Sequence, residues 1–426
     1  MYSLSLKNKK LFLNSDHSTY SSGDFLKLVN AFKETLSQYK RIALGLEDVY
    51  EFSAAFIAVG SLGKEMIVLP NHQEGTLSEY KTHYDVLISK APKATSMGTE
   101  KLELNINSKI TFFTSGSQGK SKTVSKTLEL LVNECEALEL QFGESIKDTV
   151  FLSTVGHQHI YGILFRVLWP LINDRTIASF NILYPETLDK MLTQSKEKFT
   201  LVSSPAFIKR LGANELSDTC GLSFVFSSGG KLEYPYFRKF YDLTKVAPTE
   251  VYGSTETGGV AFRTQVDANQ YWQTLSGVEI SSNSDGCLVV ESRFILNGSF
   301  KTKDLVSILN DRSFKLLGRS DRILKIEEKR ISLDEMERIL ISLENIIDIH
   351  CTVLNQGTRE VIGCVIAESK KWRAEHTLVK VKEIKALLLR YFEPILIPKK
   401  FRFLDELPYN KQSKITAQTL AGLFND

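Results

Sequence analysis

The sequence predicts an α/β protein with a large N-terminal domain, residues 1–318, and a small α+β C-terminal domain, residues 319–426. Three observations support this fold class. Short apolar runs alternate with helical stretches up to about residue 265, which is typical of mostly parallel sheets with helices. A strand-rich subdomain is predicted at about 265–317. A new strand and helix pattern then begins near 318–321.

The alternation of elements is clearest at residues 41–70, "RIALGLEDVYEFSAAFIAVGSLGKEMIVLP", which predict strand, helix and strand. It continues through "DVLIS", "ITFFTSG", the helix "TLELLVNECEALELQF", "TVFLST", "FTLVSSP" and "LSFVFSSGG". Ligands of such sheets bind at the carboxyl ends of strands. Because "FFTSG" and "FVFSSGG" both end a strand in small residues, these two strand ends could face one ligand.

The sequence pattern changes after Gln265. Short alternating segments are separated by "NSDG", "LNGS" and "LNDRS", which are hairpin and turn signals. From "GRSDRILKIEEKRISLDEMERILISL" onward the pattern is strand then helix, and it continues as α+β to the end. We therefore expect a domain boundary at residues 318–321.

Composition predicts a protein that acts on small molecules. A chain of 426 residues suggests two or three domains, and 42% hydrophobic with 24% charged residues is ordinary for a soluble globular protein. The formal net charge is only +3, from 53 basic and 50 acidic residues. Such a small imbalance argues against nucleic acid or an anionic membrane surface as partner.

Cysteine usage and the N-terminus predict a cytosolic protein. The five cysteines form no C-x-x-C pair and no metal-ligand spacing with histidine: Cys135, Cys220, Cys287, Cys351 and Cys364. The start "MYSLSLKNKKLFL" has no apolar segment of a signal peptide. The longest apolar stretch, residues 150–171, contains His157, His159 and Arg166, which argues against a membrane span.

The stretch "FFTSGSQGKSKTV" at residues 112–124 resembles a phosphate-binding loop. A Walker A loop needs four residues between its glycines, whereas only two separate Gly116 from Gly119. Either another nucleotide-binding loop or an ordinary flexible turn remains possible from this stretch alone.

A series of motifs decides between them. After "TSGSQGKSK" come "HQHIYG" at 157–162, "SSGG" at 227–230, "VYGSTETGG" at 251–259, "FKTKDLV" at 300–306, "GRSDRILKI" at 318–326 and "LPYNKQSKI" at 407–415. In this order they resemble the adenylate-forming superfamily, the acyl- and aryl-acid ligases related to acyl-CoA synthetases and to adenylation domains of peptide synthetases. The resemblance covers nearly the whole chain.

The resemblance implies an enzyme that uses ATP and Mg²⁺ to adenylate a carboxylic acid, after which a thiol displaces AMP. Bringing a carboxylate to a triphosphate requires cations and N–H donors positioned in advance. Tyr252 matches the family's adenine-stacking residue, Thr255 its α-phosphate hydroxyl and Glu256 its magnesium ligand. Asp304 matches the acceptor of the ribose hydroxyls, and Arg319 a basic partner there. The remaining implied nucleotide contacts are Thr114, Ser115, Gly116, Ser117, Gly119, Lys122, Ser228, Gly229, Gly230 and Gly253.

The resemblance also implies a mobile C-terminal domain. Lys414 matches the lysine that bridges the substrate carboxylate and the α-phosphate, with Lys411 as the neighbouring alternative. Asp321 matches the hinge about which the small domain rotates. In one pose Lys414 reaches the carboxylate, and in the other "KIEEKRISL" faces the incoming thiol.

The "HQHIYG" segment matches the part of the family that lines the acyl pocket. His159 is the expected gate, with Tyr161 and Gly162 near the substrate floor, while His157 could be purely structural. On a strand, His157 and His159 would point to opposite faces, so a zinc site or a serine triad is not expected here.

Three positions depart from the family pattern. Lys303 replaces a glycine before Asp304, Ser413 replaces a glycine before Lys414, and Glu328 stands where the thiol-delivering loop often has glycine. The bulkier Glu328 would reshape the pantetheine path. The thiol acceptor, an acyl carrier protein or CoA, stays open.

The short chain, "HQHIYG" and "KIEEKRISL" most resemble the small ligases of aryl-polyene and xanthomonadin-type pigment pathways. Such a ligase would activate an aromatic acid such as a hydroxybenzoate, or a short acyl group. One alternative is a medium- or long-chain fatty acyl-CoA synthetase, although the stretch before the phosphate loop is short. The other is an inactive nucleotide-binding scaffold, motivated by Lys303, Glu328 and Ser413.

Overall fold

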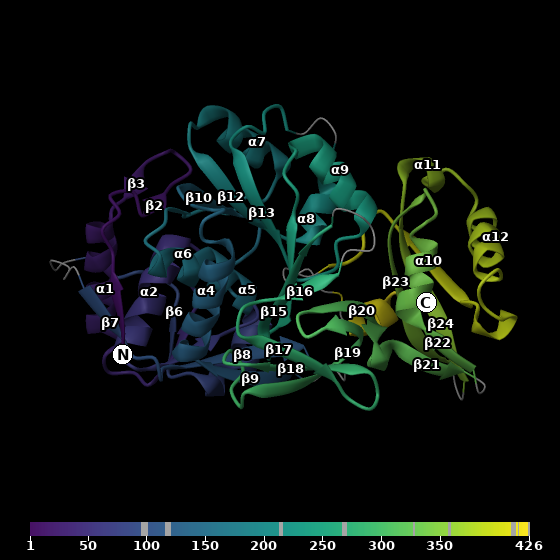
Figure 1. Cartoon of the computed structure of the whole chain (residues 1–426), viewed down its shortest axis with the longest axis horizontal. Coiled ribbons are helices and arrows are strands. Elements are labelled where there is room, and N and C mark those ends of the chain that lie inside the picture. Colours follow the sequence, from purple (N-terminus) through teal and green to yellow (C-terminus); the bar gives the residue numbers. More distant parts are fainter. Residues whose placement is uncertain are drawn as a thin grey trace.

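The computed structural model describes residues 1–94, 101–115, 121–212, 216–265, 271–326, 329–356, 359–409, 415 and 417–424. The protein is an α/β molecule with a large mixed sheet, which confirms the predicted fold class. Its N-terminal part holds two large sheets and a two-stranded sheet, with helices around and between the large ones, and a smaller C-terminal part lies to one side (Figure 1).

The helices of the N-terminal part are α1 (Ser22–Leu36), α2 (Val49–Ser61), α3 (Glu74–Glu79), α4 (Leu128–Phe142), α5 (Ile160–Gly162), α6 (Trp169–Ile172), α7 (Pro185–Gln194), α8 (Pro205–Arg210) and α9 (Tyr234–Thr244). Those of the C-terminal part are α10 (Leu333–Leu340), α11 (Lys370–Arg373), α12 (Thr377–Leu388) and α13 (Ala417–Gly422). Short 3₁₀ turns are η1 (Lys81–His83), η3 (Ser320–Arg322) and η4 (Pro394–Leu396), and η2 (Ile163–Leu168) is π-helical.

The strands up to β13 are β1 (Tyr2–Ser5), β2 (Phe12–Leu13), β3 (Thr19–Tyr20), β4 (Arg41–Leu44), β5 (Glu65–Val68), β6 (Val86–Ile88), β7 (Lys101–Leu104), β8 (Lys109–Ser115), β9 (Ser121–Thr127), β10 (Thr149–Ser153), β11 (Ile177–Ala178), β12 (Lys198–Ser203) and β13 (Leu222–Ser227). The later strands are β14 (Thr249–Ser254), β15 (Gly258–Thr264), β16 (Trp272–Thr274), β17 (Val278–Ser282), β18 (Cys287–Ser292), β19 (Ser299–Asn310), β20 (Ser313–Arg319), β21 (Ile323–Ile326), β22 (Lys329–Ser332), β23 (Ile346–Gln356), β24 (Arg359–Glu368) and β25 (Lys400–Leu404).

A five-stranded sheet, in the order β6-β4-β5-β8-β9, carries the phosphate-loop segment. Strands β4, β5, β6 and β8 are parallel, and the crossover from β4 to β5 is α2, as residues 41–70 predict. Asp48 caps the N-terminus of helix α2, where its side chain accepts a hydrogen bond from the backbone N–H of Glu51. Strand β9 then folds back antiparallel on β8, so the phosphate-loop segment connects the two arms of a hairpin, the phosphate hairpin.

The large sheet has thirteen strands in the order β17-β18-β19-β20-β16-β15-β14-β13-β12-β10-β11-β2-β3. Neighbours from β2 to β14 are parallel, and the strands beyond β14 are antiparallel. The segment predicted as a strand-rich subdomain therefore continues the same sheet, because β16 bonds to β15 on one side and to β20 on the other.

Alternating side chains place the large sheet between two cores. Phe151 of β10 packs into the core that contains α1, α2 and α4, together with strands of the five-stranded sheet. Its neighbours Val150 and Leu152 face the opposite side and pack with residues of α7, α8 and α9. This is the period-2 alternation of a strand that is buried on both faces.

The C-terminal part has a core of its own, with buried members between Ile331 and Ile397 from α10, α12 and the sheet β23-β24-β25. The residues after "GRSD" predict strand then helix. The structure has two strands, the antiparallel pair β21 and β22, before α10. The boundary between residues 318 and 319 stays a prediction.

Contacts between the two parts gather at α8, α9 and β23. Lys209 Nζ lies 2.9 Å from Glu233 Oε2 and 3.6 Å from Asp348 Oδ1. Tyr409 donates its hydroxyl hydrogen to Asp348 Oδ2 at 2.8 Å, and Tyr236 donates to the carbonyl of residue 347. We call Lys209, Glu233, Asp348 and Tyr409 the interdomain cluster.

Among the described residues, none of the helices combines the length and the apolar character needed to cross a bilayer.

Candidate active site

The motifs after β13 and β14 lie side by side. Because these strands are parallel neighbours, their carboxyl ends meet at one edge of the sheet. Ser228, the residue after β13, donates a hydrogen bond from its hydroxyl to the carbonyl of Val251 at 2.8 Å. The "SSGG" and "VYGSTETGG" motifs, predicted to bind one nucleotide, are thus brought together.

Tyr252, the predicted adenine-stacking residue, is held at this edge by its hydroxyl. It donates to Asp304 Oδ2 at 2.6 Å. Its ring lies 5.6 Å from the ring of Trp272 and 5.9 Å from that of Phe314, centroid to centroid. Burial first, and Asp304 second, raise the pKa of Tyr252 above its usual value, so the hydroxyl remains a donor.

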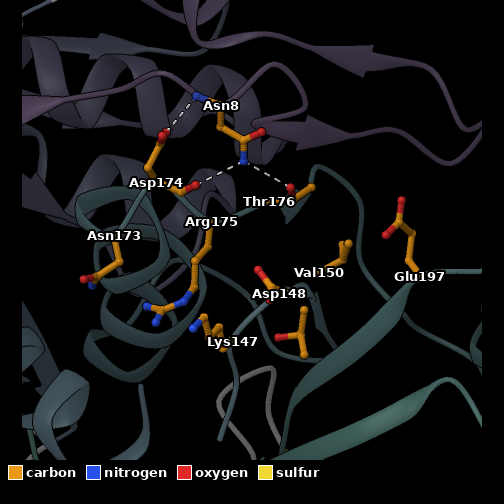
Figure 2. A pocket seen from close by; sticks show the side chains of 10 residues that line it. Asn8, Lys147, Asp148, Val150, Asn173, Asp174, Arg175, Thr176 and Glu197 are labelled. Carbon is orange, nitrogen blue, oxygen red and sulfur yellow. Dashed lines mark hydrogen bonds between the residues drawn. The ribbon is translucent and has the colours of Figure 1, made fainter. Parts of the chain in front are cut away.

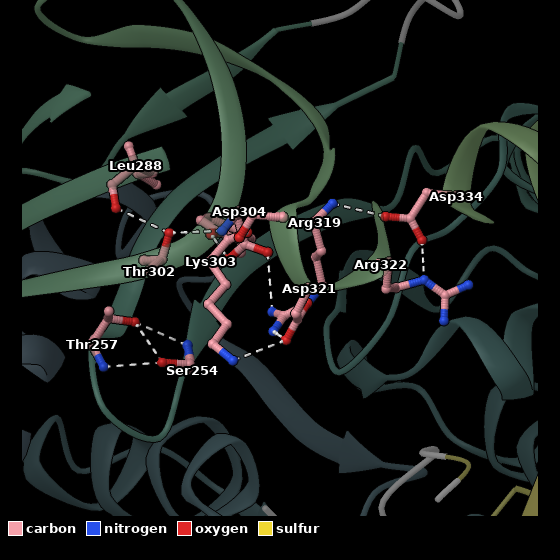
Figure 3. Close-up of polar contacts among 12 residues, drawn as sticks. Ser254, Thr257, Leu288, Thr302, Lys303, Asp304, Arg319, Asp321, Arg322 and Asp334 are labelled. Carbon is pink, nitrogen blue, oxygen red and sulfur yellow. Dashed lines mark hydrogen bonds and ion pairs between the residues drawn. The ribbon is translucent and has the colours of Figure 1, made fainter. Parts of the chain in front are cut away.

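Asp304 and Arg319 are direct partners on the antiparallel strands β19 and β20. Arg319 Nη1 lies 3.2 Å from Asp304 Oδ1, and the Nε and Nη2 groups of Arg319 donate to the two oxygens of Asp321 at 2.9 Å each. Lys303 Nζ approaches Asp321 Oδ2 at 3.4 Å (Figure 3). The hydrogen bond to Asp321 raises the pKa of Arg319 above its usual value. The predicted ribose-binding pair and the predicted hinge therefore form one charge network.

The turn between β14 and β15, which we call the 254–259 turn, carries Thr255 and Glu256. It is closed by hydrogen bonds between Ser254 and Thr257, with Ser254 N donating to Thr257 Oγ1 at 3.0 Å and Thr257 N to Ser254 Oγ at 3.1 Å (Figure 3). Gly253 permits the close approach of the two strands, because a Cβ there would lie 2.2 Å from the carbonyl oxygen of Gly258.

The phosphate hairpin approaches this turn through Lys122. Lys122 Nζ lies 4.0 Å from Glu256 Oε1. Lys122 is paired with Thr114, and Ser121 with Ser115, across β8 and β9. Gly116, Ser117 and Gly119 lie outside the described residues. The described part thus brings the predicted phosphate lysine to the predicted magnesium ligand.

The expectation that His157 and His159 lie on a strand is wrong. Strand β10 ends at Ser153, and both histidines lie between it and α5. His157 is 2% exposed, with Nε2 2.9 Å from the carbonyl oxygen of Leu46, and burial lowers its pKa to about 3. A π-helical segment follows α5. The polar residues before α5 lie where this helical segment begins, and the periodicity of apolar residues in the sequence does not indicate that start.

His159, the predicted gate, begins α5 instead. Its Nδ1 accepts a hydrogen bond from the backbone N–H of Gly162 at 3.2 Å. The neighbouring Tyr161, expected near the substrate floor, donates its hydroxyl hydrogen to the carbonyl of Ser203 at 3.1 Å and so reaches the end of β12. The gate role of His159 stays a prediction.

The described residues fit a magnesium ion only in company with phosphate. They contain no group of three or more His, Cys, Asp or Glu side chains able to hold a metal. The protein would supply the single carboxylate of Glu256, and phosphate oxygens and waters would supply the other ligands, which is the usual arrangement for Mg²⁺.

Known proteins share both sequence and fold with this chain. Residues 91–284 match the family model described as AMP-binding enzyme. A 4-coumarate–CoA ligase of Cereibacter sphaeroides is 23% identical over 72% of this chain and 70% of its own length. An L-proline–(L-prolyl-carrier protein) ligase of Pseudomonas fluorescens is 27% identical over 38% of this chain and 34% of its own. The crystal structure of ATP-bound MatB from Rhodopseudomonas palustris superposes with a TM-score of 0.80 at 15% identity, covering 99% and 96% of the two chains.

These matches support membership of this chain in the AMP-binding enzyme family. They support an AMP-forming ligase of the adenylate-forming superfamily, and the match to MatB shows the shared fold.

Several residues that the resemblance to this family makes important lie outside the described residues. These are Lys414, its alternative Lys411, and the departures Glu328 and Ser413. The third departure, Lys303, is described, and its ammonium group faces Asp321. A lysine at this position therefore places a second cation, besides Arg319, next to the predicted hinge residue.

A polar cavity of about 320 Å³ lies away from the adenylating motifs. It is lined at the amino end of β10, where Thr149 and Val150 lie, and by Asp174, Arg175 and Glu197 (Figure 2). The motifs follow the carboxyl ends of β13 and β14. Since ligands of parallel sheets bind at carboxyl ends, this cavity is not the candidate active site.

Sequence reasoning missed two buried charged residues behind the 254–259 turn, Lys126 and Glu134. Glu134 lies on the same face of α4 as Leu131 and Leu138, three and four residues away. A carboxylate on the apolar face of a predicted helix is a signal that could have found it.

Proposed function

We propose that this protein adenylates a carboxylic acid with ATP and Mg²⁺ and transfers the acyl group to a thiol. The acid is an aromatic acid such as a hydroxybenzoate, or a short acyl acid. The thiol is the phosphopantetheine of an acyl carrier protein, or CoA. The proposal includes membership of the small ligases of aryl-polyene and xanthomonadin-type pigment pathways, which the stretches "HQHIYG" and "KIEEKRISL" support.

The observation that carries the proposal is the convergence of five motif residues at one edge of the large sheet. Tyr252, Asp304 and Arg319 are joined by hydrogen bonds of 2.6 and 3.2 Å, and Lys122 approaches Glu256 at 4.0 Å. These groups match the parts of magnesium-bound ATP: an aromatic ring for adenine, a hydrogen-bond acceptor for ribose, a cation for phosphate and a carboxylate for the metal.

The proposed reaction has two steps. A carboxylate oxygen of the acid attacks the α-phosphorus of ATP, the bond from that phosphorus to the bridging oxygen breaks, and pyrophosphate leaves. The thiol sulfur then attacks the acyl carbonyl carbon, the thiol proton passes to solvent and AMP leaves. When bound, Mg²⁺ supplies charge neutralisation of the phosphates.

This chain's residues would bind and orient the reactants. Lys122 and the hydroxyl of Thr255 would contact phosphate oxygens, Tyr252 would stack on adenine, and Asp304 would exchange its present partners for ribose hydroxyls. Lys414 would bridge the two negatively charged reactants, a task suited to a compact point charge.

The test is acid-dependent pyrophosphate release across a panel of benzoates and fatty acids. Turnover with benzoates or short acids supports the proposal, and turnover with medium or long fatty acids alone would favour the fatty acyl-CoA synthetase. Binding of ATP without adenylate formation from any acid would favour the scaffold. CoA and a phosphopantetheinylated carrier protein are then compared as acceptors.

A further inference from the structure

A buried carboxylate supports the 254–259 turn from behind. Glu134 of α4 is 2% exposed, and its Oε1 accepts a hydrogen bond from the backbone N–H of Gly259 at 2.6 Å. Its Oε2 has no hydrogen-bond partner among the described residues. Burying an ionisable group in such a place costs free energy, which indicates that Glu134 has a role beyond packing.

A buried cation accompanies it. Lys126 of β9 is also 2% exposed, and its Nζ donates to the carbonyl of Phe294 at 2.7 Å. Burial lowers the pKa of Lys126, while attraction from Glu134 and Glu256 acts in the opposite direction. Burial likewise raises the pKa of Glu134 to about 7. Both Glu134 and Glu256 thus favour the charged form of Lys126.

The glycines of the "TETGG" motif fit this support. Gly258 has a φ of +69°, and a Cβ there would lie 2.4 Å from Glu134 Oε2. A Cβ on Gly259 would lie 3.1 Å from Glu134 Oε1. The backbone of the turn therefore rests directly on the carboxylate, with no room for a side chain between them.

Strand β9 and helix α4 connect this support to the phosphate hairpin. Helix α4 begins at Leu128, directly after β9 ends at Thr127, and β9 carries both Lys122 and Lys126. The turn that carries Glu256 and the hairpin that carries Lys122 are therefore both attached to the same strand and helix. Side chains that bind one ligand are held at fixed distances when they are attached to the same elements, and misplacement of any of them weakens binding.

We propose that Glu134 is a positioning residue for the ATP site, which holds the 254–259 turn in register with the phosphate hairpin. The inference rests on the proposed function. Glu134 does not touch ATP. It places Glu256, so its effect is felt in the magnesium-dependent part of ATP binding.

The experiment measures the ATP dissociation constant of the full chain by calorimetry, with magnesium and with EDTA, in the absence of any acid. Glu134→Leu removes the acceptor, Glu134→Gln keeps an acceptor oxygen, and Glu136→Gln is the control from the exposed face of the same helix. We expect Glu134→Leu to weaken ATP binding about tenfold with magnesium, as loss of one hydrogen bond to a charged group does, and to change it little in EDTA. Glu134→Gln should recover most of the loss, and the control should match the wild type.

Equal affinities of Glu134→Leu and wild type, or equal losses with and without magnesium, would overturn the positioning role. If Glu134→Leu fails to fold, Gly258→Ala gives the same test from the other side, because its methyl group displaces the turn from the carboxylate. A wild-type protein that binds no ATP would overturn the proposed function together with this inference. A wild type that binds ATP while all variants bind it equally would overturn this inference alone.

Discussion

The Lys122–Glu256 pair is a weak ion pair in a place where a ligand is expected. The side chain of Lys122 is 62% exposed, and the two charged atoms are 4.0 Å apart. Exposed pairs of this kind contribute about 0–1 kcal/mol to folding. Both side chains can therefore exchange this contact for phosphate or metal at little cost.

Glu256→Gln tests the magnesium assignment. We expect the magnesium concentration for half-maximal ATP use to rise by roughly tenfold or more, because a neutral amide is a poor ligand for a hard cation. Titration of magnesium in the pyrophosphate-release assay gives the measurement. An unchanged magnesium requirement would remove Glu256 from the metal site.

Lys414→Ala tests the residue proposed to bridge the acid and the α-phosphate. We expect adenylate formation to fall by about a hundredfold or more, because a cation that neutralises developing charge is lost. Release of AMP from a supplied acyl-adenylate by the thiol should change little. Equal loss of both half-reactions would contradict the assignment, and Lys411→Ala tests the neighbouring alternative in the same assay.

His157 gives a prediction about acid stability. In the folded protein its pKa is about 3, below the value near 6.5 of an exposed histidine. Between these values the unfolded chain binds the additional proton, so acidification below about pH 6 should destabilise the fold by up to about 1.4 kcal/mol per pH unit.

His157→Gln keeps a donor for the carbonyl of Leu46 and removes the titration. The thermal midpoint of the variant should fall less steeply between pH 6 and pH 4 than that of the wild type. Parallel pH profiles would show that folding does not lower the pKa of His157.

At the scale of elements, the interdomain cluster joins α8 and α9 to β23. Lys209 is largely buried between Glu233 and Asp348, and although burial acts in the opposite direction, these carboxylates raise its pKa. Tyr409 donates to the same Asp348. Because Tyr409 precedes Lys414 by five residues, which span at most about 18 Å, the cluster limits where that lysine can reach.

Tyr409→Phe should therefore slow adenylate formation roughly tenfold, since it removes a single hydrogen bond to a carboxylate. Thiol transfer from a supplied acyl-adenylate should be retained. Tyr391→Phe is the control, because that side chain is 60% exposed in the same part of the chain. Identical adenylation rates in Tyr409→Phe and Tyr391→Phe would show that the cluster does not position the lysine.

At the scale of the whole molecule, the connection between the two parts runs through β20 and η3. Arg319 ends β20, and Asp321 in η3 is held by Arg319 and Lys303. The backbone N–H of Arg319 also donates to Asp334 of α10 at 2.8 Å. Any rotation of the C-terminal part about Asp321 would have to break these contacts and form others in their place.

Asp321→Pro tests the hinge. Proline restricts φ to about −65°, so one of the two half-reactions should fall at least tenfold relative to the other. Asp321→Ala, which removes the ion pairs but leaves the backbone free, separates the two effects. If the ratio of the half-reaction rates is the same in Asp321→Pro as in the wild type, residue 321 is not the hinge.

Much of the N-terminal architecture could be predicted because strand and helix periodicities are local. Strands β4 and β5 and helix α2 occupy residues 41–70, and α4 occupies the predicted helix, where apolar residues recur every three to four positions. The pairing of β16 with both β15 and β20 could not be predicted. Strand neighbours in a sheet are chosen by long-range hydrogen bonding, which the local pattern does not record.

For the candidate site, the sequence by itself determined which residue types are present and in what order: an aromatic, a carboxylate and a hydroxyl near strand ends, with basic partners later in the chain. Only the tertiary structure decided that Tyr252 meets Asp304, that Lys122 faces Glu256, and that Glu134 lies beneath the turn. The reason is physical. Motif chemistry is carried by single residues, whereas distances between them depend on how distant strands pack and which charges the core encloses.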